Sequence, residues 1–376
     1  MLSLQLPSLR AMYKYLPAPL HKLIPLCFLL AFFVYAVLFR TQKLFEITKV
    51  FLNKKSFFIL LFILITLVNI LVYPLADSLK YQARGSDQDD ALIVGAKNLI
   101  SGKNPYEAHT YFPGNPLSPG PGWLIMNLPF TTSGLYCLLT PFYISVLGLL
   151  IRKLSAGYYA ANVFLILCSS SLAFWETMVA GSDLFAVGAL FTVCLYFVYA
   201  GFGKSKLLSF LSAMLLALAA TSRIIFAYII AVMGILLWRR SGKKYIGFLV
   251  FSLVFAVLLH LIFYLWNPGS YTPLHLIRKG NRLMPFALKI PCIILSLSFI
   301  LRTFFKAKTR FDSWLFYFWL CMAIPISCVS FGELIVRGFN LTLWEGANYL
   351  IVLMLIYVVY FALGVEKEPN RNVNIL

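Results

Sequence analysis

The sequence predicts an all-α polytopic membrane protein, a single integral membrane domain over residues 1–376. Hydrophobic residues make up 61% of the chain and charged residues 12%, and the mean hydropathy is +0.85, far above the range of soluble domains. Apolar segments of bilayer-spanning length, roughly 20 residues each, follow one another with short connections. About ten or eleven such segments can be placed, which leaves room for one long loop and for no separate soluble domain.

Each predicted span is an apolar segment that is bounded by charged or turn-forming residues. In chain order the segments are 23–39, 56–76, 132–151, 157–175, 178–200, 207–221, 224–238, 245–265, 290–305, 314–330 and 346–364. The basic stretch after the first span places the N-terminus outside, unless segment 23–39 re-enters the membrane or forms a hairpin with its neighbours. The prolines and the short apolar run before residue 23 argue against a signal peptide and for a segment along the interface.

The charge pattern sets the predicted topology. If the loop after residue 77 lies outside, nine of the thirteen acidic residues fall at the outer face. The opposite side then carries most of the basic residues, as the positive-inside rule requires: Arg40, Lys43, Lys49, Lys54, Lys55, Arg152, Lys153, Lys204, Lys206, Arg239, Arg240, Lys243, Lys244, Lys306, Lys308 and Arg310. The net charge of +19 therefore reflects membrane insertion and contact with lipid headgroups, and nucleic acid is not an expected partner.

The seven cysteines all lie in apolar spans, and the chain has no CxxC motif or Cys/His cluster. We therefore expect neither disulfides nor a thiolate metal site, but cysteines that fill the core.

Residues 77–130 form the one extended polar loop, which we expect to be the outer catalytic loop. The stretch "DDALIVGAKNLISG" has apolar residues at helical spacing and ends at Gly102, so it predicts an amphipathic interfacial helix. Asp87, Asp89 and Asp90 surround its first turn. One interpretation is capping of the helix and interaction with its dipole. The other is that one carboxylate acts as a general base, or that Asp87 and Asp89 bind a divalent cation, Mg²⁺ or Mn²⁺.

The motifs in this loop carry a resemblance. "SDQDD", then "GA.NLISGKNPY", then "EAHTYFPGNPLSP" are similar to the first outer loop of the type C glycosyltransferase (GT-C) superfamily, membrane enzymes that use polyprenyl-phosphate-linked sugars. The polyprenyl-phosphate-mannose-dependent mannosyltransferases come nearest. The first mannosyltransferase of GPI-anchor synthesis is also similar, although Ala108, His109 and the run Phe112-Pro113-Gly114 depart from its pattern. The resemblance extends more loosely over residues 56–238 and implies roles for Glu176 and Asp183 in a second outer loop and for Arg223 at the next outer turn.

Further candidates for substrate binding lie on the outer side. Tyr106, His109 and Tyr111 belong to a rigid loop rich in proline and aromatic residues that predicts a pocket wall. Arg278, Lys279 and Arg282 form a basic cluster that breaks the positive-inside rule. Such a cluster suits the phosphate of a lipid-linked sugar, or equally the headgroups of anionic lipids. For Glu176 and Asp183 the alternative is a solvated interfacial position, and for Arg223 it is snorkelling.

The predicted function is an inverting glycosyltransferase that moves a hexose, mannose being one candidate, from a polyprenyl phosphate to a glycan or glycolipid acceptor at the outer face. Asp87 is the first choice for the base, with Asp89 and Asp90 as alternates. The short chain favours a bacterial plasma membrane, with the endoplasmic reticulum and a lumenal site as the alternative. A transporter or flippase for a lipid-linked sugar and an assembly subunit without chemistry are the competing functions.

Overall fold

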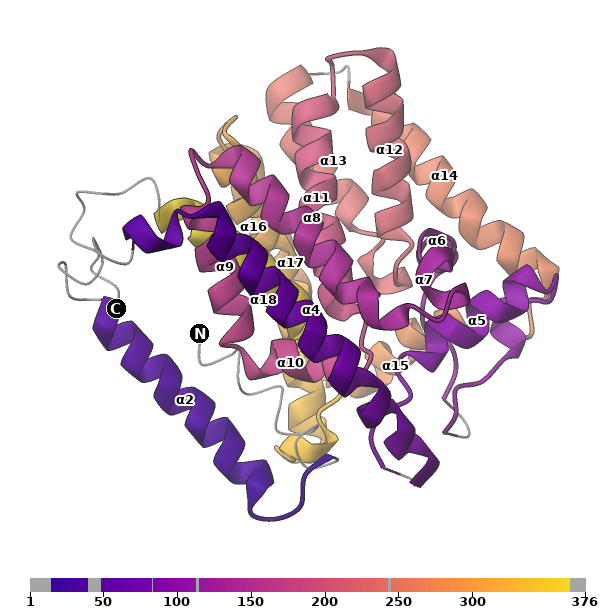
Figure 1. Ribbon diagram of the computed structural model, residues 1–376. Helices are drawn as coiled ribbons and strands as arrows, with labels where there is room; N and C mark the ends of the chain where they lie inside the picture. The colour runs from indigo at the N-terminus through magenta and orange to yellow at the C-terminus, as the bar shows by residue number, and fades with distance from the viewer. Residues whose placement is uncertain (1–14, 40–48, 83, 113–114, 243–244, 366–376) are drawn as a thin grey trace.

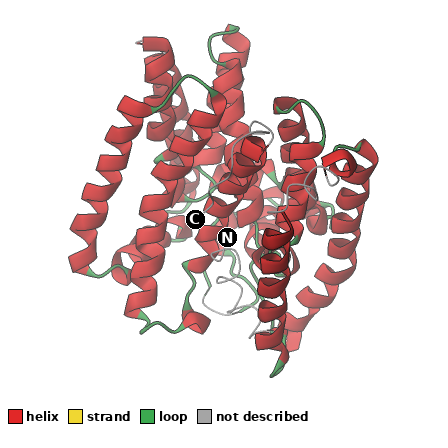
Figure 2. Ribbon diagram, turned by 90° about the vertical axis from the view of Figure 1, so that its left-hand side faces the viewer, coloured by secondary structure: helices red, strands yellow, loops and turns green. Residues whose placement is uncertain are grey.

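The computed structural model describes residues 15–39, 49–82, 84–112, 115–242 and 245–365. Within these ranges every regular element is a helix (Figure 2). One isolated β-bridge joins His109 to Pro116. The α-helices are α2 (Leu20–Phe39), α4 (Lys55–Ser78), α5 (Asp90–Ile100), α6 (Pro121–Met126), α7 (Leu128–Thr132), α8 (Leu139–Leu154), α9 (Tyr159–Ser169), α10 (Leu172–Val179), α11 (Leu184–Gly201), α12 (Lys206–Ala220), α13 (Ile229–Ser241), α14 (Tyr245–Trp266), α15 (His275–Leu283), α16 (Phe286–Lys306), α17 (Phe311–Val336) and α18 (Ala347–Val365).

The helices confirm a polytopic all-α membrane protein, but the number of full-length spans is smaller than predicted. Among the described residues, seven helices are long and apolar enough to cross a bilayer, and the pair α9 and α10 makes an eighth candidate. The remaining three predicted spans are short apolar helices, Leu20–Leu30, Lys206–Ala220 and Ile224–Trp238. A helix of 15 residues such as α12 is about 22 Å long, which is less than the roughly 30 Å of a hydrocarbon core.

Two predicted boundaries were wrong because polar side chains interrupt the apolar segments. The span predicted over 157–175 is two helices that meet at an angle of 73°. Ser171 begins the second of them, since its side chain accepts a hydrogen bond from the amide of Phe174. The next helix, α11, starts at Leu184 rather than at residue 178. The segment between them is a tight turn at Gly181, which has a φ of +67°.

The core of the bundle surrounds α11, of which 78% is buried. This helix packs against α8, α12 and α18 (Figure 1). In contrast, α14 and α16 lie at the periphery and expose rows of Ile and Leu side chains, as expected where lipid takes the place of the protein core. Helix α2 stands apart from the other helices in Figure 1.

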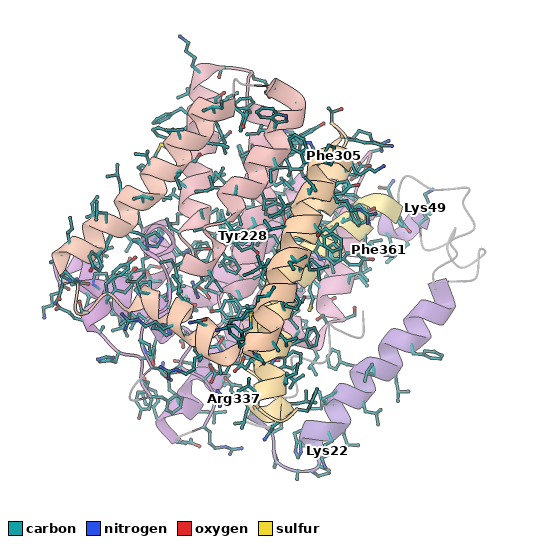
Figure 3. All side chains as sticks on the ribbon, turned by 180° about the vertical axis from the view of Figure 1, so that it is seen from behind. Lys22, Lys49, Tyr228, Phe305, Arg337 and Phe361 are labelled. Carbon is teal, nitrogen blue, oxygen red and sulfur yellow. A yellow bond between two sulfur atoms is a disulfide. The ribbon has the colours of Figure 1, made fainter. Side chains whose placement is uncertain are left out.

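The candidate functional residues gather at one end of the helical bundle, where the outer loops lie. Lys22 at the start of α2 and Arg337 after α17 lie at this end, whereas Phe305 and Lys49 lie toward the opposite end (Figure 3). We call the end that carries Asp89, Asp183 and Arg337 the loop end. Of the predicted inner basic residues, Arg40, Lys43, Lys243 and Lys244 lie outside the described residues.

The expectation about cysteines was wrong for one pair. Cys292 of α16 and Cys328 of α17 form a disulfide, so two of the apolar cysteines join neighbouring helices covalently. Their separation of 36 residues follows no motif that sequence reasoning uses.

Candidate active site

Asp89 is the most enclosed of the three clustered carboxylates, with 1% of the residue exposed. It occupies the N-cap position of α5, but its side chain makes no capping hydrogen bond, so the capping interpretation is wrong for this residue. Its Oδ2 instead accepts the hydroxyl of Tyr73 from α4 at 2.5 Å. Its Oδ1 accepts no hydrogen bond from any residue in the described part of the chain. Burial raises the pKa of Asp89 to about 7, with the Tyr73 hydrogen bond opposing the shift.

Lys80 bridges the carboxylates around Asp89. Its Nζ lies 2.8 Å from Asp77 and 2.7 Å from Asp90, and 3.9 Å from Oδ2 of Asp89. The lysine is itself buried, so these pairs are poorly screened by solvent. Asp90 also accepts the amide of Tyr111 at 3.0 Å, which ties the start of α5 to the later part of the loop. Both oxygens of Asp90 therefore accept hydrogen bonds, Oδ1 from Lys80 and Oδ2 from the backbone amide of Tyr111.

Asp87 accepts hydrogen bonds from the part of the loop that follows α5. Its Oδ2 accepts the hydroxyl of Thr110 at 2.5 Å, the amide of Phe112 at 3.2 Å and the side-chain amide of Asn115 at 3.3 Å. Three donors on one oxygen hold residues that lie between the two bridge partners, His109 and Pro116, close to the start of α5. The residue that sequence reasoning placed first as the base thus has the geometry of a scaffold carboxylate.

Asp183 and Arg223 form a buried ion pair between two turns at the loop end. The Arg223 Nη2 lies 2.6 Å and 2.8 Å from the two carboxylate oxygens, and the indole Nε1 of Trp123 donates to Oδ2 at 2.5 Å. Arg223 Nη1 also donates to the carbonyl of Ser222 at 2.8 Å. Each charge has its partner inside the protein, so the snorkelling interpretation of Arg223 and the interfacial interpretation of Asp183 are wrong. The ion pair joins the α10–α11 turn to the α12–α13 turn.

The residues predicted as a pocket wall separate into two groups. Tyr106 is buried and donates its hydroxyl to the carbonyl of Pro119 at 3.0 Å, so it supports the loop from within. His109 is exposed in its bridge with Pro116. Tyr111 is also exposed and packs edge-on against Tyr81, with 5.1 Å between ring centroids. His109 and Tyr111 are thus the members of this set that face outward.

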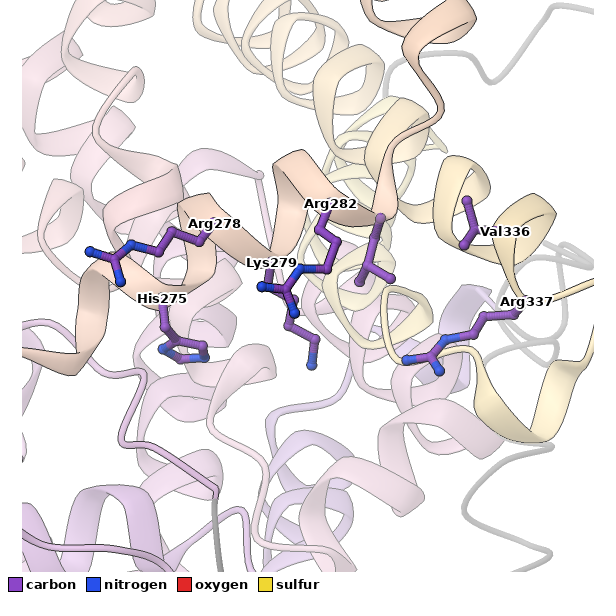
Figure 4. Close-up of a pocket in the computed structure, with 7 residues that line it drawn as sticks. His275, Arg278, Lys279, Arg282, Val336 and Arg337 are labelled. Carbon is purple, nitrogen blue, oxygen red and sulfur yellow. The ribbon is translucent and has the colours of Figure 1, made fainter.

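The predicted basic cluster lines a cavity of about 570 Å³ at the loop end. Arg278, Lys279 and Arg282 of α15 line it together with Arg337, which follows α17; in Figure 4 Arg282 and Arg337 extend toward each other, whereas Arg278 extends to the other side. Lys279 is paired with Glu345, and Arg337 lies 3.6 Å from Glu333. Arg278 and Arg282 have no acidic partner among the described residues. The cavity therefore carries an excess of positive charge and suits an anionic group such as phosphate.

The buried Asp183–Arg223 pair is linked to Asp89 through the interior of the loop end. His275 lines the cavity, and burial lowers its pKa, an effect to which the cations of Lys279 and Arg223 add. Arg223 pairs with Asp183, two residues after Gly181. The carbonyl of Gly181 accepts the hydroxyl of Tyr136 at 2.8 Å, and the Tyr136 ring packs on that of Tyr73, with centroids 5.8 Å apart. A continuous set of contacts thus runs from Arg223 to the Asp89 carboxylate.

Glu176 lies in α10 and is buried, so the solvated interfacial position considered for this residue is wrong. Burial raises the pKa of Tyr15, and the charges of Asp89 and Glu176 add to this shift.

The described residues do not assemble a set of three or more His, Cys, Asp or Glu side chains that could hold a metal ion. Asp87, Asp89 and Asp90 accept hydrogen bonds from different donors, so the divalent cation considered for Asp87 and Asp89 finds no shared ligand geometry here.

Sequence reasoning missed several residues that complete the site: Tyr15, Tyr73, Lys80, Trp123, Tyr136 and Gly181. Lys80 had a signal, since it is a lysine on the predicted outer side directly after a span, where the positive-inside rule disfavours it. The tyrosines had none, because aromatic residues are equally expected at every membrane interface.

Comparison of the chain with protein-family models, with curated proteins and with solved structures gives no match in any of the three.

Proposed function

We propose that this protein is an inverting glycosyltransferase that moves a sugar from a polyprenyl-phosphate donor to a hydroxyl of a glycan or glycolipid acceptor, with Asp89 as the general base. The proposal rests on the hydrogen bonding and burial of the Asp89 carboxylate. One of its oxygens is anchored by Tyr73 at 2.5 Å, the other accepts no bond from the described residues, and burial raises its pKa to about 7. A base whose pKa lies near the working pH is suited to proton transfer.

The proposed reaction is a single displacement. The acceptor oxygen bonds to the anomeric carbon while the bond from that carbon to the phosphate oxygen breaks. The electron pair of the broken bond leaves with the polyprenyl phosphate, and the acceptor proton goes to Oδ1 of Asp89. Attack opposite to the leaving group inverts the anomeric centre.

The cationic cavity supplies what such a leaving group requires. Arg278 and Arg282 lack acidic partners within the described ranges, and two parallel N–H donors of an arginine match a phosphate. Cations held in place before the reaction stabilise a developing anion without reorganisation of solvent. The apolar surfaces of α14 and α16 beside this end suit a donor with a long hydrocarbon chain.

A transporter or flippase is less well supported, because such proteins place polar groups near the middle of the bilayer. Mid-span polar side chains of this chain bond locally: Asn69 donates to the carbonyl of Cys137, and Thr192 donates to Gly188 of its own helix at 3.1 Å. The charged network lies instead at the loop end.

The test compares Asp89→Asn with Asp87→Asn in membranes that contain the full chain, with transfer of radiolabelled sugar from a polyprenyl phosphate as the readout. Asp89→Asn is isosteric and should reduce turnover by about 10²–10⁴-fold. Asp87→Asn keeps an acceptor oxygen for Thr110 and should lose much less. Equal losses in the two variants, or full activity in Asp89→Asn, would exclude Asp89 as the base.

A further inference from the structure

The cationic cavity runs along one face of α15. Four of its lining residues recur at the spacing of successive helical turns, so their side chains share that face: His275, Arg278, Lys279 and Arg282. His275 and Arg282 are seven residues apart, which corresponds to about 10 Å along a helix axis. The volume of about 570 Å³ falls among pockets that enclose a whole small molecule, roughly 300–1,000 Å³. The cavity therefore has room for a phosphate and for a group attached to it.

The two ends of the cavity differ in chemistry. At one end Arg282 and Arg337 extend toward each other (Figure 4). The residues next to them in sequence, Leu283 and Val336, add apolar side chains to the lining at this end. At the other end lies His275 (Figure 4). A phosphate held by the two guanidinium groups would thus have apolar side chains beside it and an imidazole across the cavity.

His275 is the one side chain able to accept a hydrogen bond among the described residues that line the cavity. The arginines and the lysine can only donate, and leucine and valine have no polar side-chain atom. Nδ1 of His275 lies 2.6 Å from the carbonyl oxygen of Thr272, and because a carbonyl only accepts, Nδ1 carries the hydrogen. Burial lowers the pKa of His275, which favours the neutral ring. Nε2 is then an acceptor, and it receives no hydrogen bond from the part of the chain that the structure describes.

This arrangement discriminates between phosphate esters. The oxygens of a phosphate diester accept hydrogen bonds, so they pair with Arg282 and Arg337 but offer nothing to Nε2 of His275. A free hydroxyl on the alcohol part of the ester supplies the missing donor. The lining as a whole therefore matches a phosphate ester whose alcohol carries a hydroxyl, and it matches a phosphate on a plain hydrocarbon less well.

We propose that His275 is a specificity-determining residue: its Nε2 accepts a hydroxyl from the alcohol part of a phosphate ester whose phosphate lies against Arg282. In the proposed function this ester is the donor, the hydroxyl belongs to its sugar, and the polyprenyl chain leaves past Leu283 and Val336. That assignment rests on the proposed function, whereas the preference for a hydroxyl-bearing phosphate ester does not. A lipid headgroup with free hydroxyls, such as phosphoglycerol, offers the same chemistry.

Two soluble probes test the preference without any assay of transfer. Mannose 1-phosphate and methyl phosphate carry the same phosphate group, but only the first has free hydroxyls. Each is titrated calorimetrically into the full chain in phosphatidylcholine nanodiscs at pH 8, where both monoesters are dianions. The parent chain should bind mannose 1-phosphate about five- to tenfold more tightly, the gain expected from one hydrogen bond. Equal Kd values, or no binding of either probe, would overturn the proposal.

Substitutions at His275 separate ligand binding from support of the helix. His275→Asn keeps an amide donor for the carbonyl of Thr272 but has no atom at the position of Nε2, so the preference should disappear while the Kd for methyl phosphate stays unchanged. His275→Gln extends an acceptor oxygen toward that position and should recover part of the preference. His21→Asn, the same substitution outside the cavity lining, should keep the preference. Equal weakening of both probes by His275→Asn would mean that His275 only holds the start of α15, and the proposal would fall.

Lipid exchange identifies the source of the ester. Phosphatidylglycerol and phosphatidylethanol have the same charge, but only the first has free hydroxyls on its headgroup. Displacement of mannose 1-phosphate by phosphatidylglycerol alone would assign the site to a lipid headgroup. Displacement by neither lipid would leave a lipid-linked sugar as the ligand. Equal displacement by both would show recognition of charge alone and would contradict the role of His275.

The two proposals can fail separately. If the probes follow the expected order but no polyprenyl-phosphate sugar supports transfer, the specificity of the cavity stands and the glycosyltransferase proposal falls. If Asp89→Asn abolishes transfer while the two probes bind equally and His275→Asn leaves the KM for the donor unchanged, the reverse holds.

Discussion

The hydroxyl of Tyr73 donates to Oδ2 of Asp89 at 2.5 Å, across sixteen residues of sequence, and this bond orients a carboxylate whose Oδ1 is buried and accepts no hydrogen bond from the described residues. Its neighbour Asp87 accepts three loop donors on Oδ2, and Asp90 accepts Lys80 and the amide of Tyr111.

Tyr73→Phe should move the pH dependence of turnover. The base must be ionised, so activity rises as the pH increases through the pKa of Asp89, which burial places at about 7. The Tyr73 hydrogen bond lowers that pKa, and its loss should displace the rising limb of the profile to higher pH. A profile of kcat against pH measures this. A uniform loss of activity with an unmoved limb would mean that Tyr73 only supports the fold.

Gly181→Ala should disturb Asp89 directly. The added methyl group would meet the Asp89 side chain at 2.7 Å and would sit on a backbone with a φ of +67°. Gly134 is the matched control, since it has a φ of +75° and nothing within 4 Å of an added Cβ. Gly134→Ala should cost about 1 kcal/mol of stability and little activity, whereas Gly181→Ala should cost more and should reduce turnover. Thermal unfolding and transfer rates are measured for both variants. An effect shared by the two reports backbone strain, and an effect confined to Gly181→Ala reports the contact of the new methyl group with Asp89.

Asp183→Asn should destabilise the protein by about 3–5 kcal/mol, because it leaves the buried Arg223 without its counter-charge. Replacing both partners, Asp183→Asn with Arg223→Met, should recover part of the loss. Unfolding in detergent, followed through the fluorescence of Trp123 and the other tryptophans, gives both values. A double variant less stable than Asp183→Asn alone would contradict a simple paired-charge role.

Arg282→Ala should raise the KM for the polyprenyl-phosphate donor by about ten- to a hundredfold, as expected for the loss of a charge-assisted contact to phosphate. Lys103→Ala is the control, since this exposed lysine lies on the same outer loop away from the cavity. Equal effects of the two substitutions would indicate a general electrostatic attraction rather than a phosphate site.

The orientation in the membrane is open to a direct measurement. With Cys27 replaced by serine, exposed Gln88→Cys should react with a membrane-impermeant maleimide added outside, and exposed Lys153→Cys should react only after permeabilisation. The opposite pattern would place Asp89 in the cytoplasm and would end the proposal of an outer site.

Most of the helical architecture was predictable from composition and periodicity. All eleven predicted apolar segments are helical in the described residues, and helix α5 ends at Ile100, just before the predicted stop at Gly102. The full length of each span could not be predicted from the sequence. The bend before α10 depends on where the bundle buries Ser171, and the end of the short α12 depends on where it buries Arg223.

The sequence by itself determined that acids and a basic cluster gather at one end of a membrane protein, because hydropathy and charge are properties of local segments. Only the tertiary structure decided which carboxylate is available. That choice depends on Tyr73, Thr110 and Gly181, which approach the three aspartates from sixteen to over ninety residues away. Hydrogen bonding and desolvation act over a few ångströms of space, and a linear pattern of residue types does not encode those distances.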